Sequence, residues 1–206
     1  MPVEPTDTAT GRPPLLAPTR AGSRSGSAWL LALAYTALAL PVLWTGPQTT
    51  AVVLPTLVLG VALVALSLID LATLRLPDAL TLPLIAAGIG FAALFKWDGT
   101  SWGDLRWRIA AAAVGYGLLV GVAWLYHRWR GRHGLGLGDA KLLAAAGAWL
   151  GLEGLAPTLL AASLSGLVAA LLSHVAGRPI TAVTRVPFGP FLAGAIWLIW
   201  LYGVPL

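Results

Sequence analysis

Seven apolar stretches, each close to the length of a membrane crossing, constrain this chain more than any other feature. A helix needs about 20 apolar residues to cross a hydrocarbon layer about 30 Å thick. In lipid, only helices and closed barrels satisfy their own backbone polar groups. The pattern predicts an all-α fold, a polytopic transmembrane bundle of about seven helices, in which one helix precedes a six-helix core. The stretches cover residues 28–45, 51–69, 79–95, 108–126, 139–155, 157–176 and 188–203.

Composition supports a membrane protein and excludes several functions. The chain is 58% hydrophobic and 10% charged, whereas soluble domains carry about 25% charged residues. The net charge of +5 does not indicate a nucleic-acid partner, because the basic residues lie in short loops between apolar stretches, where they report membrane orientation. The chain has no cysteine, which excludes disulfides, thiolate metal sites and a cysteine nucleophile.

Residues 1–27 are rich in Pro, Thr, Ser, Gly and Arg and lack apolar periodicity, a composition typical of a disordered tail. We therefore divide the chain into a tail, residues 1–27, and a transmembrane domain, residues 28–206, whose motifs lie within 51–203. The first apolar stretch could be a cleaved signal peptide. However, no clean A-x-A site follows it before Pro47, so we expect an uncleaved helix.

The distribution of Lys and Arg predicts the orientation. With seven helices, three basic residues fall on one side of the membrane and ten on the other. Because the cytoplasmic side carries the excess of positive charge, we expect a cytoplasmic N-terminus and a C-terminus on the outer side. The three are Lys96, Arg106 and Arg108, and the ten are Arg12, Arg20, Arg24, Arg75, Arg128, Arg130, Arg132, Lys141, Arg178 and Arg185.

Two acidic residues lie at the edges of apolar stretches. Asp70 ends the second stretch and Asp139 begins the fifth, so in this topology both reach the cytoplasmic level. An ionisable group inside a membrane segment is costly unless it is paired or reaches water, which makes each a candidate functional residue. The alternative is structural, with Asp70 paired to Arg75 and Asp139 capping its helix beside Lys141. Position alone does not separate the two interpretations.

Glycine alternates with leucine immediately before Asp139, in Gly134-Leu-Gly136-Leu-Gly138-Asp139. Irregular backbone at membrane depth is tolerated where it lines an aqueous cavity or is covered by protein, so the run indicates a water-accessible pocket beside Asp139. The alternative is a loop outside the membrane. A nucleotide-binding loop is disfavoured, because no strand precedes these glycines and neither phosphate-loop pattern is complete.

Three ordered segments resemble the prepilin peptidases, also called type IV leader peptidases. The first begins at Asp70 and continues through Pro77 and Asp78; the second contains the family's GxGD element, Gly136 to Asp139, followed by Lys141. The third is Pro187-Phe-Gly189-Pro190, which separates the chain from the presenilin-like proteases that share GxGD.

The resemblance implies an aspartyl endopeptidase of the bacterial inner membrane with Asp70 and Asp139 as its catalytic pair. The other motif residues, Pro77, Asp78, Gly136, Gly138, Lys141, Pro187, Gly189 and Pro190, would support the site, with Asp78 capping its helix. The implied substrates are prepilin or pseudopilin precursors, cut at the cytoplasmic face after a glycine and before an apolar helix. Competing functions are a proton-coupled transporter and an inactive membrane scaffold.

No cofactor is expected. Many members carry an N-terminal region with paired CxxC motifs, associated with methylation of the new N-terminus, and no cysteine is present, so methyltransferase activity and bound zinc are not expected. His127, His133 and His174 occur singly, without a recognisable set of metal ligands.

Two carboxyls near one water are expected to hold a single proton between them. Asp139 lies at a helix N-terminus, where the helix dipole favours negative charge, whereas Asp70 lies at a C-terminus. This difference predicts Asp139 as the initial base. Small residues in the fourth to sixth stretches would permit close helix contacts or a gap for a substrate helix; they are Gly115, Gly117, Gly121, Gly147, Gly151 and Gly166.

Overall fold

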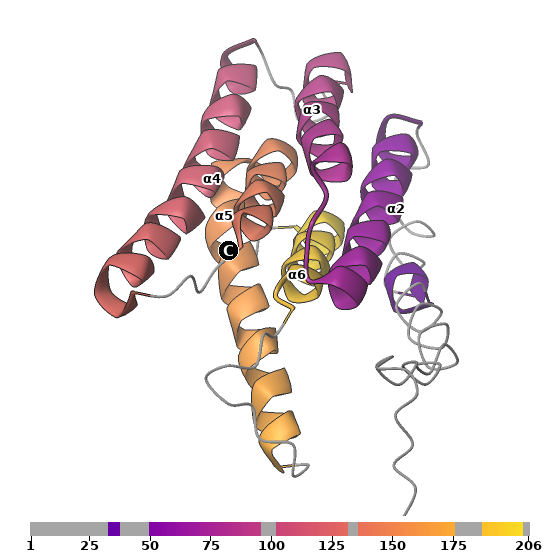
Figure 1. Ribbon diagram of the computed structural model, residues 1–206. Helices are drawn as coiled ribbons and strands as arrows, with labels where there is room; N and C mark the ends of the chain where they lie inside the picture. The colour runs from indigo at the N-terminus through magenta and orange to yellow at the C-terminus, as the bar shows by residue number, and fades with distance from the viewer. Residues whose placement is uncertain (1–32, 38–49, 96–101, 132–135, 176–186, 204–206) are drawn as a thin grey trace, which may run out of the picture.

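The computed structural model describes residues 33–37, 50–95, 102–131, 136–175 and 187–203. All regular secondary structure within these residues is helical, which confirms the predicted all-α fold (Figure 1). Of the first apolar stretch, residues 33–37 are described and are helical; the predicted tail, Gly134 and His133 lie outside the described residues. The long elements are α2 (Thr50–Thr73), α3 (Asp78–Phe95), α4 (Trp102–Arg130), α5 (Leu137–Val175) and α6 (Gly189–Tyr202).

Three of these helices are long and apolar enough to cross a membrane: Val53–Thr73, Leu105–Arg130 and Leu137–Val175. Helices α3 and α6 are shorter but also apolar. Large side chains such as Trp129, Leu160 and Leu167 are exposed on the helix surfaces, as expected where the surrounding solvent is lipid rather than water.

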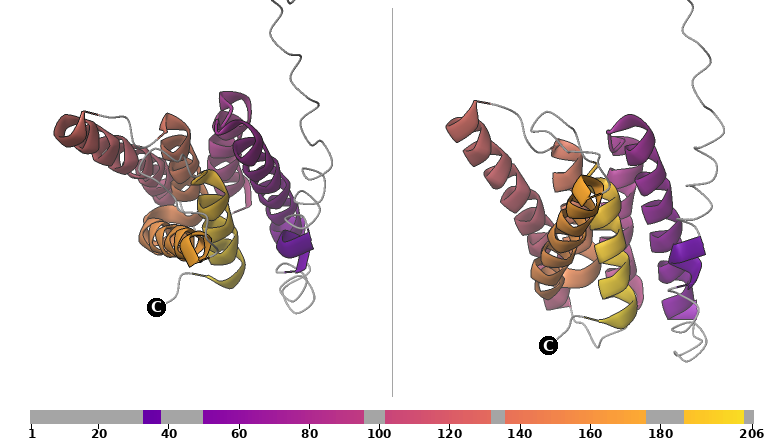
Figure 2. Two further views of the ribbon diagram at one scale, coloured as in Figure 1. Left: turned by 60° about the horizontal axis from the view of Figure 1, so that its bottom comes forward. Right: turned by 90° about the horizontal axis from the view of Figure 1, so that it is seen from below.

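Contacts between helices fix their relative directions (Figure 2). Helices α2 and α6 are antiparallel: Gly189 at the start of α6 contacts Asp70 near the end of α2, and Trp200 near the end of α6 donates through Nε1 to Thr56 Oγ1, 3.1 Å away, near the start of α2. The start of α5 lies beside the start of α3, where Lys141 contacts Asp78. The ends of α3 and α5 that carry motif residues therefore lie on the same side of the bundle as the end of α2.

Helices α4 and α5 approach closely through glycine. A Cβ atom at Gly115 would lie 2.6 Å from the Leu143 carbonyl oxygen, and one at Gly147 would overlap the Ala111 backbone. By contrast, nothing lies within 4 Å of a Cβ placed at Gly117 or Gly121. These four glycines thus divide into two groups: Gly115 and Gly147 allow close helix packing, whereas Gly117 and Gly121 face open space.

Helix α5 is broken at Gly151, which has φ 76° and ψ −174°, a conformation essentially restricted to glycine. The chain changes direction there (Figure 1), so the two predicted stretches 139–155 and 157–176 form two segments, as expected. The predicted boundary at residue 156 is wrong, because Pro157 lies within the second segment and the positive φ at Gly151 is what interrupts the helix.

Arg108 lies opposite this break. Its Nη1 donates to the carbonyl oxygen of Trp149 at 2.7 Å and lies 3.5 Å from that of Ala148. These carbonyls belong to the last turn of the first α5 segment, and the carbonyls at the end of a helix need partners from outside the helix. The sequence predicts Arg108 at the start of an apolar stretch. In the structure Arg108 lies inside α4, because this helix begins earlier, at Trp102.

Candidate active site

The two predicted aspartates are brought together from α2 and α5. Asp70 lies in the last turn of α2, and Asp139 lies in the first turn of α5. Asp70 is 5% exposed, whereas Asp139 is only partly buried. Their carboxyls are close enough for the two charges to interact. Two carboxyl groups in this relation, one of them reachable by solvent, can share a proton and bind a water molecule.

Asp70 is held by the start of α6. The backbone N–H of Gly189 donates to Asp70 Oδ2 at 3.0 Å, and Pro190 follows in the first turn, where its missing N–H costs no hydrogen bond. Asp70 therefore faces the N-terminus of α6 as well as lying near the C-terminus of its own helix. The difference between the two helix ends that predicts Asp139 as the initial base is consequently smaller than the sequence indicates.

Asp139 is held by its own motif. Its backbone N–H donates to the Gly136 carbonyl at 3.2 Å, and its Oδ2 lies 3.6 Å from where a Cβ of Gly136 would be. A Cβ at Gly138 would lie 2.8 Å from Cβ of Leu76 in the turn between α2 and α3. The first glycine of the GxGD element thus lies beside the carboxylate, and the second lets α5 approach that turn.

The turn between α2 and α3 has an unusual backbone. Leu74 has φ 53°, a conformation disfavoured for a residue with a Cβ, and its N–H donates to the Asp70 carbonyl at 2.8 Å. Pro77 then begins α3 by accepting hydrogen bonds from Leu80 and Thr81. The contact of Leu76 with Gly138 was not predicted, and no sequence signal indicates it, because it depends on how two distant elements pack.

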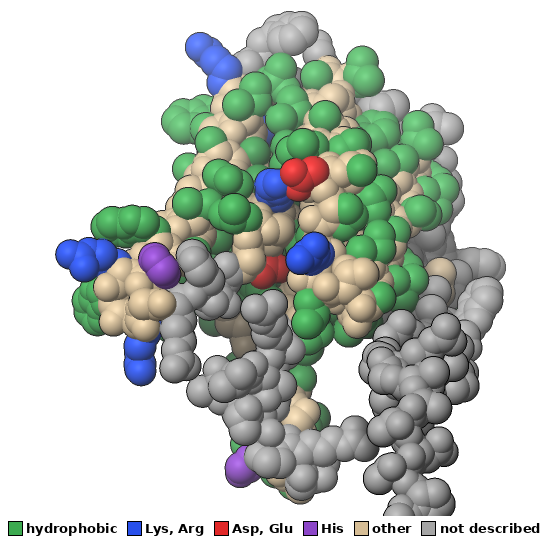
Figure 3. Space-filling model, viewed as in Figure 1, with side chains coloured by type: hydrophobic (Ala, Val, Ile, Leu, Met, Phe, Trp, Pro, Cys, Tyr) green, Lys and Arg blue, Asp and Glu red, His purple; other side chains and the backbone are tan. Residues whose placement is uncertain are grey.

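Lys141 and Asp78 form an ion pair, 2.5 Å from Nζ to Oδ1, that joins the starts of α5 and α3. Asp78 begins α3 as expected, but its carboxylate is directed to Lys141 on another helix. Among the described residues, Asp70 forms no ion pair with Arg75, so the structural alternative for Asp70 is not observed. Figure 3 shows acidic and basic side chains gathered near the centre of an otherwise largely apolar face.

No three His, Cys, Asp or Glu side chains converge into a metal site within the described parts of the chain.

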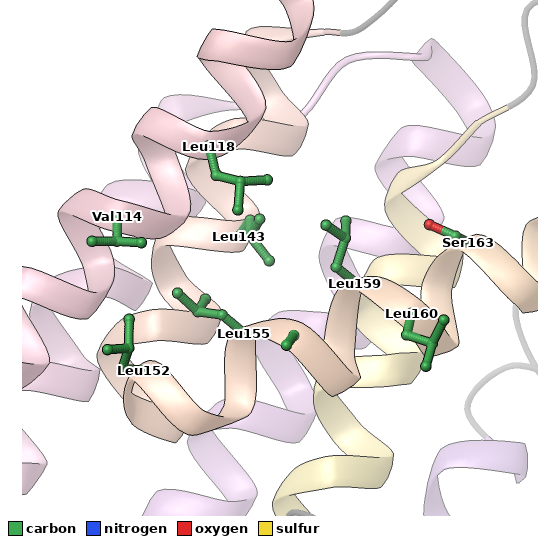
Figure 4. Close-up of a pocket in the computed structure, with 9 residues that line it drawn as sticks. Val114, Leu118, Leu143, Leu152, Leu155, Leu159, Leu160 and Ser163 are labelled. Carbon is green, nitrogen blue, oxygen red and sulfur yellow. The ribbon is translucent and has the colours of Figure 1, made fainter.

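An apolar groove of about 530 Å³ lies between α4 and the two segments of α5 (Figure 4). Ser163 is the one polar residue among those that line it, and Leu143 is one helical turn from Asp139. The groove therefore extends along the helix that carries one of the two aspartates. Its lining residues are Val114, Leu118, Leu143, Leu152, Leu155, Ala156, Leu159, Leu160 and Ser163.

Comparison with known proteins identifies the family. A family model described as Type IV leader peptidase family matches residues 57–171, more than half of the chain. The chain belongs to this family. The matched region contains Asp70 and Asp139 and ends before Pro187-Phe-Gly189-Pro190. That segment is connected to the site by the hydrogen bond from Gly189 to Asp70.

Several curated relatives of this chain are named prepilin leader peptidase/N-methyltransferase. The protein of Burkholderia pseudomallei (strain K96243) is 42% identical over 144 residues, 70% of this chain and 45% of the relative. That of Aeromonas hydrophila is 41% identical over 155 residues (73% and 50%), and that of Escherichia coli (strain K12) 44% over 128 residues (62% and 54%). The chain spans about half the length of these relatives. No solved structure gives a significant match.

Proposed function

We propose that this membrane protein is an aspartyl endopeptidase that removes the leader of prepilin-like or pseudopilin precursors. Cleavage would occur at the cytoplasmic face of the bacterial inner membrane, after a glycine and before the apolar helix of the precursor. The observation that carries the proposal is the convergence of Asp70 and Asp139 from two helices: Gly138, next to Asp139, packs against Leu76 in the turn that follows α2, and the Gly189 N–H donates to Asp70. Membership of the leader peptidase family supplies the substrate class.

In the proposed mechanism the two carboxyls share one proton. The ionised carboxyl removes a proton from water, which attacks the peptide carbonyl, while the protonated one donates a hydrogen bond to the carbonyl oxygen and then a proton to the leaving amine. We retain Asp139 as the initial base. It is less buried than Asp70, so water reaches it more readily. Asp70 would then hold the shared proton at the start and give it to the leaving amine.

The groove between α4 and α5 supports a position for the substrate. Its lining is almost entirely apolar, so its occupant must be apolar as well. Leu143 lies one turn from Asp139 on the same helix, so a helix seated there would place its end beside the carboxyls. We therefore assign the groove to the apolar helix of the precursor, with the polar leader emerging at the site.

The test is cleavage of a prepilin with a glycine-terminated leader by protein purified in detergent. We expect wild type to cut, and Asp70→Asn and Asp139→Asn each to lose at least about 1,000-fold in rate, as removal of a group from a cooperating catalytic set does. Glu153→Gln is the matched control. Glu153 is exposed and follows the Gly151 break, away from the starts of α5 and α6, so its variant should cut like wild type.

Equal cleavage by all four folded proteins would refute the catalytic assignment. Absence of cleavage by folded wild type across several prepilins would favour a proton-coupled transporter or an inactive scaffold. The transporter function is then tested by comparing proton uptake into vesicles that contain wild type with uptake into vesicles that contain Asp70→Asn or Asp139→Asn.

A further inference from the structure

Helix α6 supplies no carboxylate or other candidate catalytic side chain to the site, yet its first residue contacts one of the two aspartates. We infer that Gly189 is a positioning residue for Asp70: its N–H orients the carboxylate, and its lack of a side chain leaves the space that the carboxylate occupies. The consequence for catalysis rests on the proposed function. The contact itself does not, and can be tested separately.

The space around Gly189 is filled by Asp70. A Cβ at position 189 would lie 2.6 Å from Oδ2, 3.0 Å from Cγ and 3.3 Å from Cβ of Asp70. These separations are shorter than the van der Waals contact of about 3.5–4.0 Å between carbon atoms. Any residue larger than glycine must therefore displace either α6 or the Asp70 carboxylate.

Helix α6 is the harder of the two to move. The Trp197 ring packs against Gly60 of α2, with Cη2 2.8 Å from where a Cβ would lie, and Trp197 Nε1 donates to the Tyr35 carbonyl at 3.0 Å. Trp200 is bonded to Thr56. Two indole rings thus fix the register of α6 against its neighbours, so a methyl group at position 189 would act mainly on the carboxylate.

Gly189 also fixes the direction of the Asp70 carboxylate. Its N–H donates to Oδ2 at 3.0 Å. A carboxylate that accepts a hydrogen bond from a fixed backbone donor keeps its side chain in one rotamer. The second oxygen is then presented in a constant direction. In an enzyme, displacing a reacting group by about 1 Å can cost roughly 100-fold in rate, so the position of this glycine has a direct chemical consequence.

The first test is a double-mutant cycle on stability, measured as the apparent melting temperature from tryptophan fluorescence in detergent. The four proteins are wild type, Gly189→Ala, Asp70→Ala and the double variant. We expect Gly189→Ala to lower the melting temperature of the wild-type protein and to lower that of the Asp70→Ala variant by less than half as much. Of the three nearest atoms, Oδ2 and Cγ are absent from the Asp70→Ala variant and Cβ, at 3.3 Å, remains.

The second test measures cleavage kinetics, with Gly194→Ala as the matched control on the same helix. A Cβ at Gly194 meets only the Tyr35 hydroxyl oxygen, at 3.8 Å, so this variant should behave like wild type. For Gly189→Ala we expect kcat to fall roughly 10- to 100-fold with KM changed less than about twofold, because substrate binding does not require the orientation of Asp70.

Equal destabilisation by Gly189→Ala in the wild-type protein and in the Asp70→Ala variant would overturn the inference, because the effect would then come from α6 packing alone. Wild-type kcat in Gly189→Ala would also overturn it. Failure of wild type to cut prepilins refutes the proposed function instead, and leaves the stability cycle to decide the positioning role.

Discussion

Among single residues, the two glycines of the GxGD element have different steric surroundings. A Cβ at Gly136 would meet Asp139 Oδ2 at 3.6 Å, an ordinary contact, whereas one at Gly138 would meet Cβ of Leu76 at 2.8 Å. A Cβ atom cannot move without its backbone, so Gly138 has no room for a methyl group. The sequence motif does not distinguish these positions, but the packing of the turn between α2 and α3 does.

We predict that Gly138→Ala lowers the cleavage rate roughly 100-fold by shifting the start of α5, and that Gly136→Ala retains more activity. The rate is measured with the purified prepilin assay. Gly90→Ala is the control, because nothing lies within 4 Å of a Cβ there. The steric explanation fails if Gly136→Ala is as impaired as Gly138→Ala, or if the Gly138 variant cuts like wild type.

The sequence predicted that Asp70 and Asp139 lie at the same level, because each lies at the edge of an apolar stretch on the same predicted side. The resemblance also named Gly136 and Gly189 as supporting residues, but it did not predict the contacts that they make. Gly189 lies far along the chain from Asp70, and a backbone N–H leaves no signature in residue type. Leu76 is an ordinary apolar residue whose importance arises only from its contact with Gly138.

Among the helices, the order and approximate bounds were predicted from hydropathy, but the interruption of α5 was not correctly placed. Proline favours a break near Pro157, yet a proline can be accommodated in a membrane helix. The positive φ of Gly151 interrupts the helix instead. The carbonyls exposed by that break are bound by Arg108, a role hidden from the sequence because the two residues lie on different helices.

We predict that Arg108→Met destabilises the protein by about 1 to 3 kcal/mol, because the charged donor to the Trp149 carbonyl is lost. Arg106→Met is the matched control, since Arg106 is exposed on the same helix. Thermal unfolding in detergent measures both variants. A stability of Arg108→Met equal to that of Arg106→Met would show that water or other donors replace the guanidinium.

For the whole molecule, the helix directions place Trp129 near the end of α4 and Tyr202 near the end of α6 on opposite sides of the membrane. Both are well exposed, at 80% and 59%. Because the sequence contains no cysteine, a single cysteine introduced at either position can be labelled specifically with a maleimide. With a cytoplasmic N-terminus, we predict that a membrane-impermeant maleimide labels Tyr202→Cys in spheroplasts and labels Trp129→Cys only after the membrane is opened. The reverse pattern would invert the predicted orientation.

The dependence of Asp70 on Gly189 also has a consequence for how the protein is made. During synthesis, both aspartates enter the membrane before α6 does, since Gly189 follows them in the chain. Until α6 inserts against α2, Asp70 lacks the N–H that it binds in the finished protein. A ribosome-bound chain carrying only α2 to α5 would therefore hold both carboxyls without the group that orients one of them.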